Sequence, residues 1–152
     1  MSYTSNKTDK EFDEKMIDLR RVTRVVAGGK RFRFRATVVI GNRKGMVGVG
    51  TAKGLDVAQS IEKARRAAHK NLITVTLKEE RTIPHQSEAK YSAAKILIKP
   101  GRAGHGLSAG GASRAVLELA GIKDASAKTL GTTKNKLTNA MATLEALKKL
   151  KS

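Results

Sequence analysis

The chain has 152 residues and is strongly basic, with 31 Lys and Arg against 13 Asp and Glu and a formal net charge of +18. Such an excess predicts a polyanionic partner, either nucleic acid or an anionic membrane surface. Hydrophobic residues make up 39%, which excludes a wholly disordered basic tail. The absence of cysteine excludes disulfides and thiolate zinc sites. We expect no transmembrane helix and no signal peptide.

The first strongly basic segment begins at Arg20, after a polar start of mixed charge. We expect residues 1–13 to be flexible. Residues 20–35, RRVTRVVAGGKRFRFR, contain seven Lys or Arg and no acidic residue. The pair Gly28-Gly29 separates two strand-like runs, which predicts a hairpin with a two-residue turn.

Residues 30–40 predict a strand with two different faces, because side chains alternate along a strand. We expect Phe32 and Phe34 to be buried against a helix, so that replacing either by Ala costs about 3–5 kcal/mol. The outward face then carries Arg31, Arg33 and Arg35, directed at RNA phosphates. Two alternatives stay open: the arginines form a solvated face that aids solubility, or the Phe rings stack on bases.

The following segments complete a first module of three antiparallel strands and a helix. Residues 41–45 predict a turn and 46–51 a short, Gly-rich strand. Asp56 and Gln59 match a capping box at the start of a helix. The apolar stripe of this helix comprises Val57, Ile61, Ala64, Ala68 and Leu72.

The second part of the chain predicts the order β-β-α-β-α, with the helices on one face of a sheet. Residues 73–91 are weakly extended and 92–100 form a strand. A Gly-rich loop then leads into a helix that ends at Gly121. A further extended run precedes a final helix over residues 138–151. The boundary between the two modules is expected near residues 73–82.

The sequence contains little that indicates an enzyme. His69, His85 and His105 lack metal-ligand spacing, and no pair of carboxylates forms a motif. The segment PGRAGHGLSAGGAS resembles the phosphate loop of small-metabolite kinases. The chain, however, is about half as long as such kinases, and no acidic residue is placed to bind Mg²⁺. We expect no catalytic residue, metal, cofactor or small-molecule substrate. The loop could instead bind an RNA phosphate or allow a close neighbour.

Four segments together resemble the bacterial type of ribosomal protein five of the small subunit. They are RVTRVVAGGKRFRFRATVVIGNRKGMVGVGTAKG, TIPHQSEAKYSAAKILIKPG, GLSAGGASRAVLELAGIKDASAKTLGT and the closing helix. The resemblance covers residues 14–150 in one collinear order. This chain departs from the family pattern at Arg102 and His105, and residues 132–139 lack the usual Asn-Pro.

The resemblance implies an α+β chain of two small domains. Residues 14–77 would form a double-stranded-RNA-binding-like β-β-β-α module without its first helix. Residues 78–152 would form the family's second domain, a β-β-α-β-α sandwich with a left-handed β-α-β unit. The shared fold would account for the kinase-like loop without shared chemistry.

The role implied is that of a non-enzymatic constituent of the cytoplasmic small ribosomal subunit. It would bind small-subunit ribosomal RNA between body and head, beside ribosomal proteins four and eight. It would also lie where mRNA enters and influence translational accuracy. The alternatives are a free-standing RNA-binding module or chaperone, a kinase-class enzyme and a membrane-surface binder.

The charge pattern and the resemblance together select a set of RNA-binding residues, and the resemblance alone implies a second set that contacts a protein. The predicted RNA-binding residues are Arg20, Arg21, Arg24, Gly28, Gly29, Lys30, Arg31, Arg33, Arg35, Arg43, Lys44, Lys53, Lys128 and Lys134. The residues predicted to face ribosomal protein four are Gly104, His105, Gly106 and Arg114.

Overall fold

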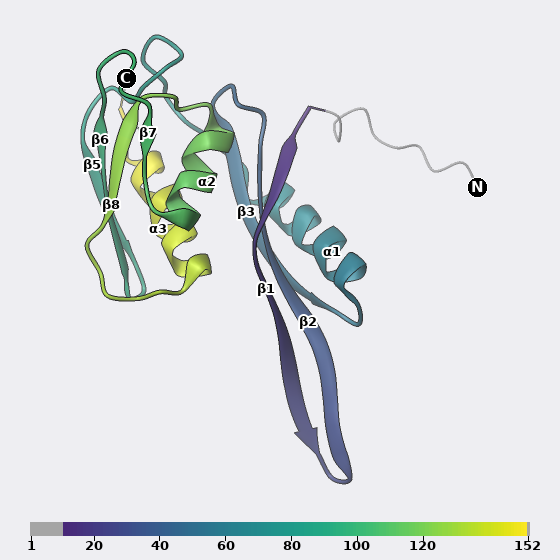
Figure 1. Ribbon diagram of the computed structural model, residues 1–152. Helices are drawn as coiled ribbons and strands as arrows, with labels where there is room; N and C mark the ends of the chain where they lie inside the picture. Colours follow the sequence, from purple (N-terminus) through teal and green to yellow (C-terminus); the bar gives the residue numbers. More distant parts are fainter. Residues whose placement is uncertain (1–10, 152) are drawn as a thin grey trace.

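The computed structural model describes residues 11–151, which form two four-stranded sheets and three helices (Figure 1). The segment predicted to be flexible lies mostly outside the described residues, and a strand already begins at Asp13. The first half contains β1 (Asp13–Val26), β2 (Gly29–Gly41), β3 (Met46–Gly54), α1 (Val57–Lys70) and β4 (Ile73–Thr74). The second half contains β5 (Ser87–Tyr91), β6 (Ala94–Pro100), β7 (Leu107–Ser108), α2 (Gly111–Ala120), β8 (Ala125–Thr129) and α3 (Lys136–Lys148).

The first sheet has the order β1-β2-β3-β4 and is antiparallel throughout. The short strand β4 adds a fourth member to the three strands predicted. Val26 pairs with Gly29, so the two turn residues are Ala27 and Gly28, one position earlier than predicted. Gly28 has a φ of +89°, a conformation that a glycine adopts without steric cost.

Helix α1 packs closely on β2 and β3 (Figure 1). Its start is capped as predicted: Asp56 accepts a hydrogen bond from the Gln59 N–H at 2.7 Å, and the Gln59 side chain accepts one from the Leu55 N–H at 2.8 Å. A Cβ at Gly50 would overlap the carbonyl oxygen of Ala64. The Gly-rich sequence of β3 therefore lets the helix backbone lie directly on the strand.

The predicted burial of Phe32 is wrong. The cluster beneath α1 consists of Ala36, Val38, Ile40, Ala64 and Ala68. Phe32 is 47% exposed, and Phe34 is half-buried and lies outside that cluster. Phe32 is exposed because the neighbouring strand ends before it. Strand β3 pairs with β2 only from Phe34 onward, so Phe32 lies where the hairpin has no third strand.

The second sheet has the order β5-β6-β8-β7, with β7 and β8 parallel and α2 connecting them. The predicted order is confirmed, with the two-residue strand β7 added before α2. Gly121 ends α2 in the left-handed conformation at a φ of +92°. Helices α2 and α3 lie between the two sheets (Figure 1). Family membership, described below, supports the α+β fold of two domains, whereas their exact division at residues 77 and 78 stays a prediction.

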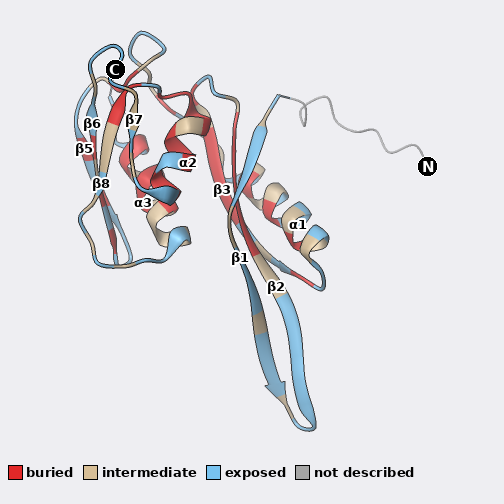
Figure 2. Ribbon diagram, in the orientation of Figure 1, coloured by how far each residue is buried: buried red, intermediate tan, exposed pale blue. Residues whose placement is uncertain are grey.

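The two domains share one hydrophobic core. Val39, Val47 and Val49, on the face of the first sheet opposite α1, belong to the same cluster as Val116 and Leu144 of the second domain. Figure 2 shows the buried residues concentrated around α2, α3 and the adjoining part of β2 and β3. Residues 36–41 of β2 and 47–50 of β3 are consequently buried on both faces.

Replacing Ile40 by Ala should destabilise the protein far more than replacing Phe32 by Ala. Ile40 is 1% exposed beneath α1, so its truncation leaves a cavity and should cost about 2–5 kcal/mol. Phe32 lies outside the core, so its truncation should cost less than about 1 kcal/mol. Urea unfolding of both variants measures this difference. Equal losses of stability would contradict the observed burial.

Candidate nucleic-acid interface

The hairpin of β1 and β2 projects beyond the rest of the molecule (Figure 1). Its outer half is mostly exposed, whereas the inner half of β2 is buried (Figure 2). Long alternating runs on both sides of Gly28 allow the two strands to stay paired from Val26 back to Asp13. The most basic segment of the chain therefore lies on a protruding two-stranded ribbon.

Strand pairing collects six predicted RNA-binding residues on one side of this ribbon. Arg20 lies opposite Arg35, Arg24 opposite Arg31, and Arg35 opposite Lys53 on β3. We call this set the cationic face: Arg20, Arg24, Arg31, Arg33, Arg35 and Lys53. Four of its members, with Val22, Thr23 and Val26, line a groove of about 440 Å³.

The cationic face is poorly neutralised by the protein itself. Arg20 Nε lies 3.1 Å from Asp18 Oδ2, and the other five cations have no ion pair within residues 11–151. The Nε of Arg35 is buried and lacks a hydrogen-bond partner among those residues. Like charges directly opposite each other destabilise a sheet. A polyanion in the groove would remove this repulsion.

The opposite side of the hairpin carries the other predicted residues of this segment. Arg21 pairs with Phe34, and Lys30 with Val25. The Arg21 guanidinium carbon lies 4.6 Å from the centroid of the Phe32 ring. Gly28 and Gly29 form the tip. The hairpin thus has an arginine-rich side and a mixed aromatic and cationic side.

Four predicted RNA-binding residues lie away from the hairpin. Arg43 and Lys44 are in the β2–β3 turn, where Arg43 Nε contacts Asp13 Oδ2 at 2.8 Å. Lys128 is exposed on β8, opposite Leu97, and Lys134 is exposed in the loop before α3. RNA binding by these four residues stays a prediction, and the structure does not bring them together with the cationic face.

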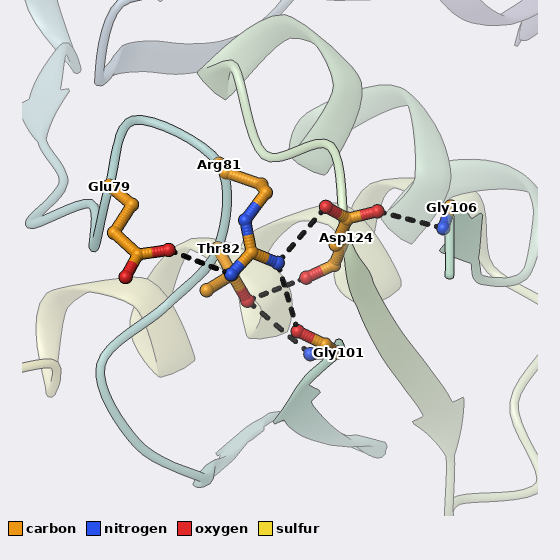
Figure 3. Close-up of polar contacts among 6 residues, drawn as sticks. All are labelled: Glu79, Arg81, Thr82, Gly101, Gly106 and Asp124. Atoms are coloured by element: carbon orange, nitrogen blue, oxygen red, sulfur yellow. Dashed lines mark hydrogen bonds and ion pairs between the residues drawn. The ribbon is translucent and has the colours of Figure 1, made fainter. Parts of the chain in front are cut away.

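The Gly-rich loop between β6 and β7 contains Gly104, His105 and Gly106, and Arg114 is exposed on the first turn of α2. His105 Nε2 lies 3.1 Å from the hydroxyl of Ser126. This loop is fixed at its base by a polar cluster that the sequence did not predict (Figure 3). The cluster centres on the buried residue Asp124.

Asp124 joins three separate segments through its carboxylate and its carbonyl. Oδ1 accepts a hydrogen bond from the Gly106 N–H at 2.9 Å, and Oδ2 lies 3.1 Å from Arg81 Nη1. The hydroxyl of Thr82 donates to the Asp124 carbonyl at 2.6 Å. Arg81 also donates to the carbonyl of Gly101 at 3.3 Å (Figure 3). The Gly101 end of the loop is therefore bound directly to the 78–82 segment, and the Gly106 end is bound to it through Asp124.

The contacts with the loop and with Arg81 change the pKa of the Asp124 carboxyl. The hydrogen bond from Gly106, together with Arg81, holds the pKa of this carboxyl below its ordinary value. A lowered pKa in the folded state contributes stability above the ordinary Asp pKa. That stability disappears as the pH falls through the lowered folded-state value.

Replacing Asp124 by Asn should lower the melting temperature most at neutral pH. The amide keeps an acceptor for Gly106 but loses the charge that pairs with Arg81. The difference from the original chain should narrow as the pH falls through the acid range, because the original carboxylate is then protonated. Glu80→Gln is the control, since Glu80 is exposed without an ion pair in the described residues. A difference constant with pH would contradict this account.

Other kinds of site receive no support from the described residues. Within residues 11–151 no group of three or more His, Asp or Glu side chains is arranged to hold a metal ion. No helix in this part of the chain is long and apolar enough to cross a membrane.

A two-domain α+β fold with a protruding, poorly neutralised basic hairpin is typical of a protein that binds a polyanion. The family described as "Ribosomal protein S5, N-terminal domain" matches residues 12–76, and "Ribosomal protein S5, C-terminal domain" matches residues 89–152. The chain therefore belongs to the ribosomal protein S5 family, whose members are structural ribosomal proteins and not enzymes. This confirms the resemblance seen in the sequence.

Individual relatives agree with this assignment. "Small ribosomal subunit protein uS5" of Campylobacter jejuni is 50% identical over 141 residues, which cover 93% of this chain and 95% of that protein. The protein of the same name from Synechococcus elongatus is 46% identical over 144 residues, covering 95% and 79%. "Small ribosomal subunit protein uS5c" of Spinacia oleracea is 46% identical over 140 residues, covering 92% of this chain and 45% of that longer protein.

Proposed function

We propose that the chain is a constituent of the cytoplasmic small ribosomal subunit and binds small-subunit ribosomal RNA through the cationic face. The observation that supports this most directly is the set of five hairpin and β3 cations without ion pairs in the described residues. A ribbon two strands wide, with charges along it, fits between RNA segments and contacts phosphates on its arginine-rich side.

The finer parts of the proposal follow the family. The hairpin would lie between body and head of the subunit, with ribosomal proteins four and eight as neighbours. The loop containing Gly104, His105 and Gly106, with Arg114, would face ribosomal protein four. From that place the protein would contribute to translational accuracy and lie near the region where mRNA enters. The fixed base of the loop at Asp124 supports a defined protein contact there.

Reversing three charges of the cationic face should weaken RNA binding strongly while leaving the fold intact. The variant carries Arg24→Glu, Arg31→Glu and Arg33→Glu, all at exposed positions. The original chain should bind small-subunit ribosomal RNA with a slope steeper than about −3 in log K against log salt concentration. Losing three phosphate contacts should make that slope shallower by about 2–3. Filter binding over a salt series measures both quantities.

A matched control separates this site from the overall charge of the protein. The control reverses three exposed lysines outside the predicted set, namely Lys63, Lys70 and Lys123. It changes the net charge equally but should leave most of the affinity and slope in place. Equal losses in the two variants would contradict a specific role for the hairpin.

Cross-linking tests the proposed neighbour of the Gly-rich loop. The chain has no cysteine, so Ala103→Cys places a single reactive thiol on the exposed loop. A thiol-attached photo-cross-linker in assembled subunits should capture ribosomal protein four. Ala58→Cys, exposed on α1, is the control and should not capture it. Capture of another protein in its place from position 103 would contradict the proposed orientation.

A further inference from the structure

The side of the hairpin opposite the cationic face has an unusual composition for an exposed surface. We call it the aromatic face, and it comprises Arg21, Thr23, Val25, Lys30, Phe32 and Phe34. Val25 is 75% exposed and Phe32 is 47% exposed. Aromatic residues make up only 3% of the chain, and two of its three Phe residues lie here. An exposed aromatic ring on a protruding ribbon is costly unless another molecule covers it.

Arg21 packs against the aromatic ring at the centre of this surface. Its guanidinium lies over the Phe32 ring, with 4.6 Å between the guanidinium carbon and the ring centroid. The arrangement is a cation–π contact, which aligns a positive charge with a flat apolar group. Nucleic-acid bases stack on such groups, because every base has a π-face and a nearby phosphate attracts the cation. No acidic residue occurs between residues 20 and 35 to compete for Arg21.

The position of the ring also distinguishes it from core residues on the same strand. Ala36, Val38 and Ile40 share its side of β2 but lie beneath α1. Phe32 pairs with Thr23 of β1 alone, because the pairing of β2 with β3 ends at Phe34. The fold therefore does not require an aromatic residue at position 32 for its own core.

We infer that Phe32 and Arg21 form a stacking site for an unpaired RNA base. The inference rests on the proposed function, in which the hairpin lies within ribosomal RNA. It gives the aromatic face of that hairpin a role of its own, which is to stack on a base. The cationic face then supplies salt-dependent attraction to phosphates. The aromatic face supplies a contact that depends on the base and responds little to salt.

Phe32→Leu tests the stacking site, because leucine keeps the side chain apolar but removes the ring. Binding to small-subunit ribosomal RNA should weaken about 5- to 100-fold, the range expected for one lost base stack. The salt slope and the melting temperature should stay nearly unchanged. Inorganic polyphosphate, which has charge but no bases, should bind the variant and the original chain equally. Leu55→Ala is the control, because it truncates an apolar side chain that is 71% exposed outside the hairpin, and it should leave RNA affinity nearly intact.

A second variant reports the contact directly. The chain contains no Trp, so Phe32→Trp introduces a single indole fluorophore at the site. RNA should quench its emission by stacking, whereas polyphosphate should not. Affinity of this variant for RNA should match or exceed that of the original chain, because indole has the larger π-surface.

The outcomes separate this inference from the proposed function. If Phe32→Leu binds RNA normally while the charge-reversed variant does not, the stacking site is wrong and the phosphate-binding hairpin stands. If neither variant loses RNA affinity, the proposed function fails as well. Equal losses on RNA and polyphosphate would show that Phe32 only shapes the hairpin. Normal RNA binding with poor assembly beside other subunit proteins would assign the ring to a protein partner and overturn the stacking site.

Discussion

The direct contact between the β2–β3 turn and α2 determines how the rest of the molecule is arranged. Arg43 N–H donates to the Leu119 carbonyl and Gly45 N–H donates to the Ala120 carbonyl, both at 2.9 Å. A Cβ at Gly121 would overlap the carbonyl of Arg43. The second domain thus lies against one face of the first sheet while α1 occupies the other. With the inner half of β2 buried on both faces, the outer half extends from a rigid base.

The outer hairpin departs from the charge pairing and apolar burial seen in the core, which is typical of a functional surface. Arg20 opposite Arg35 and Arg24 opposite Arg31 place like charges beside each other, which costs stability in a sheet. Phe32 is 47% exposed and belongs to neither of the two hydrophobic clusters. The like-charge pairs and the exposed ring lie outside the hydrophobic core. The packed inner half of β2 therefore keeps its own stability in spite of them. The inner end of β2 therefore contributes to stability, and the outer end carries the proposed binding surface.

Much of this division could be predicted from the sequence, and the exceptions have physical causes. Alternation along residues 30–40 correctly assigned the two faces of the strand, so the arginines are on one side. It could not show where the covering helix ends. A 14-residue helix spans ~21 Å, whereas a 13-residue strand spans ~43 Å, so α1 covers about half of β2. The cluster at Asp124 was missed because its partner Arg81 lies 43 residues away and no local pattern joins them.

The same length mismatch leaves both sides of the outer hairpin uncovered, as the proposed contacts with RNA require. Where α1 ends, the side of β2 that it covered becomes free, and the sequence continues there with Phe rather than with a charged residue. Charge on one face attracts any polyanion, because phosphates are alike along a nucleic acid. An aromatic ring paired with Arg21 on the other face would add a contact that a base can make and a phosphate alone cannot. Affinity and discrimination between nucleic acid and other polyanions would then come from opposite sides of one strand, in the alternating order FRFR that its sequence shows.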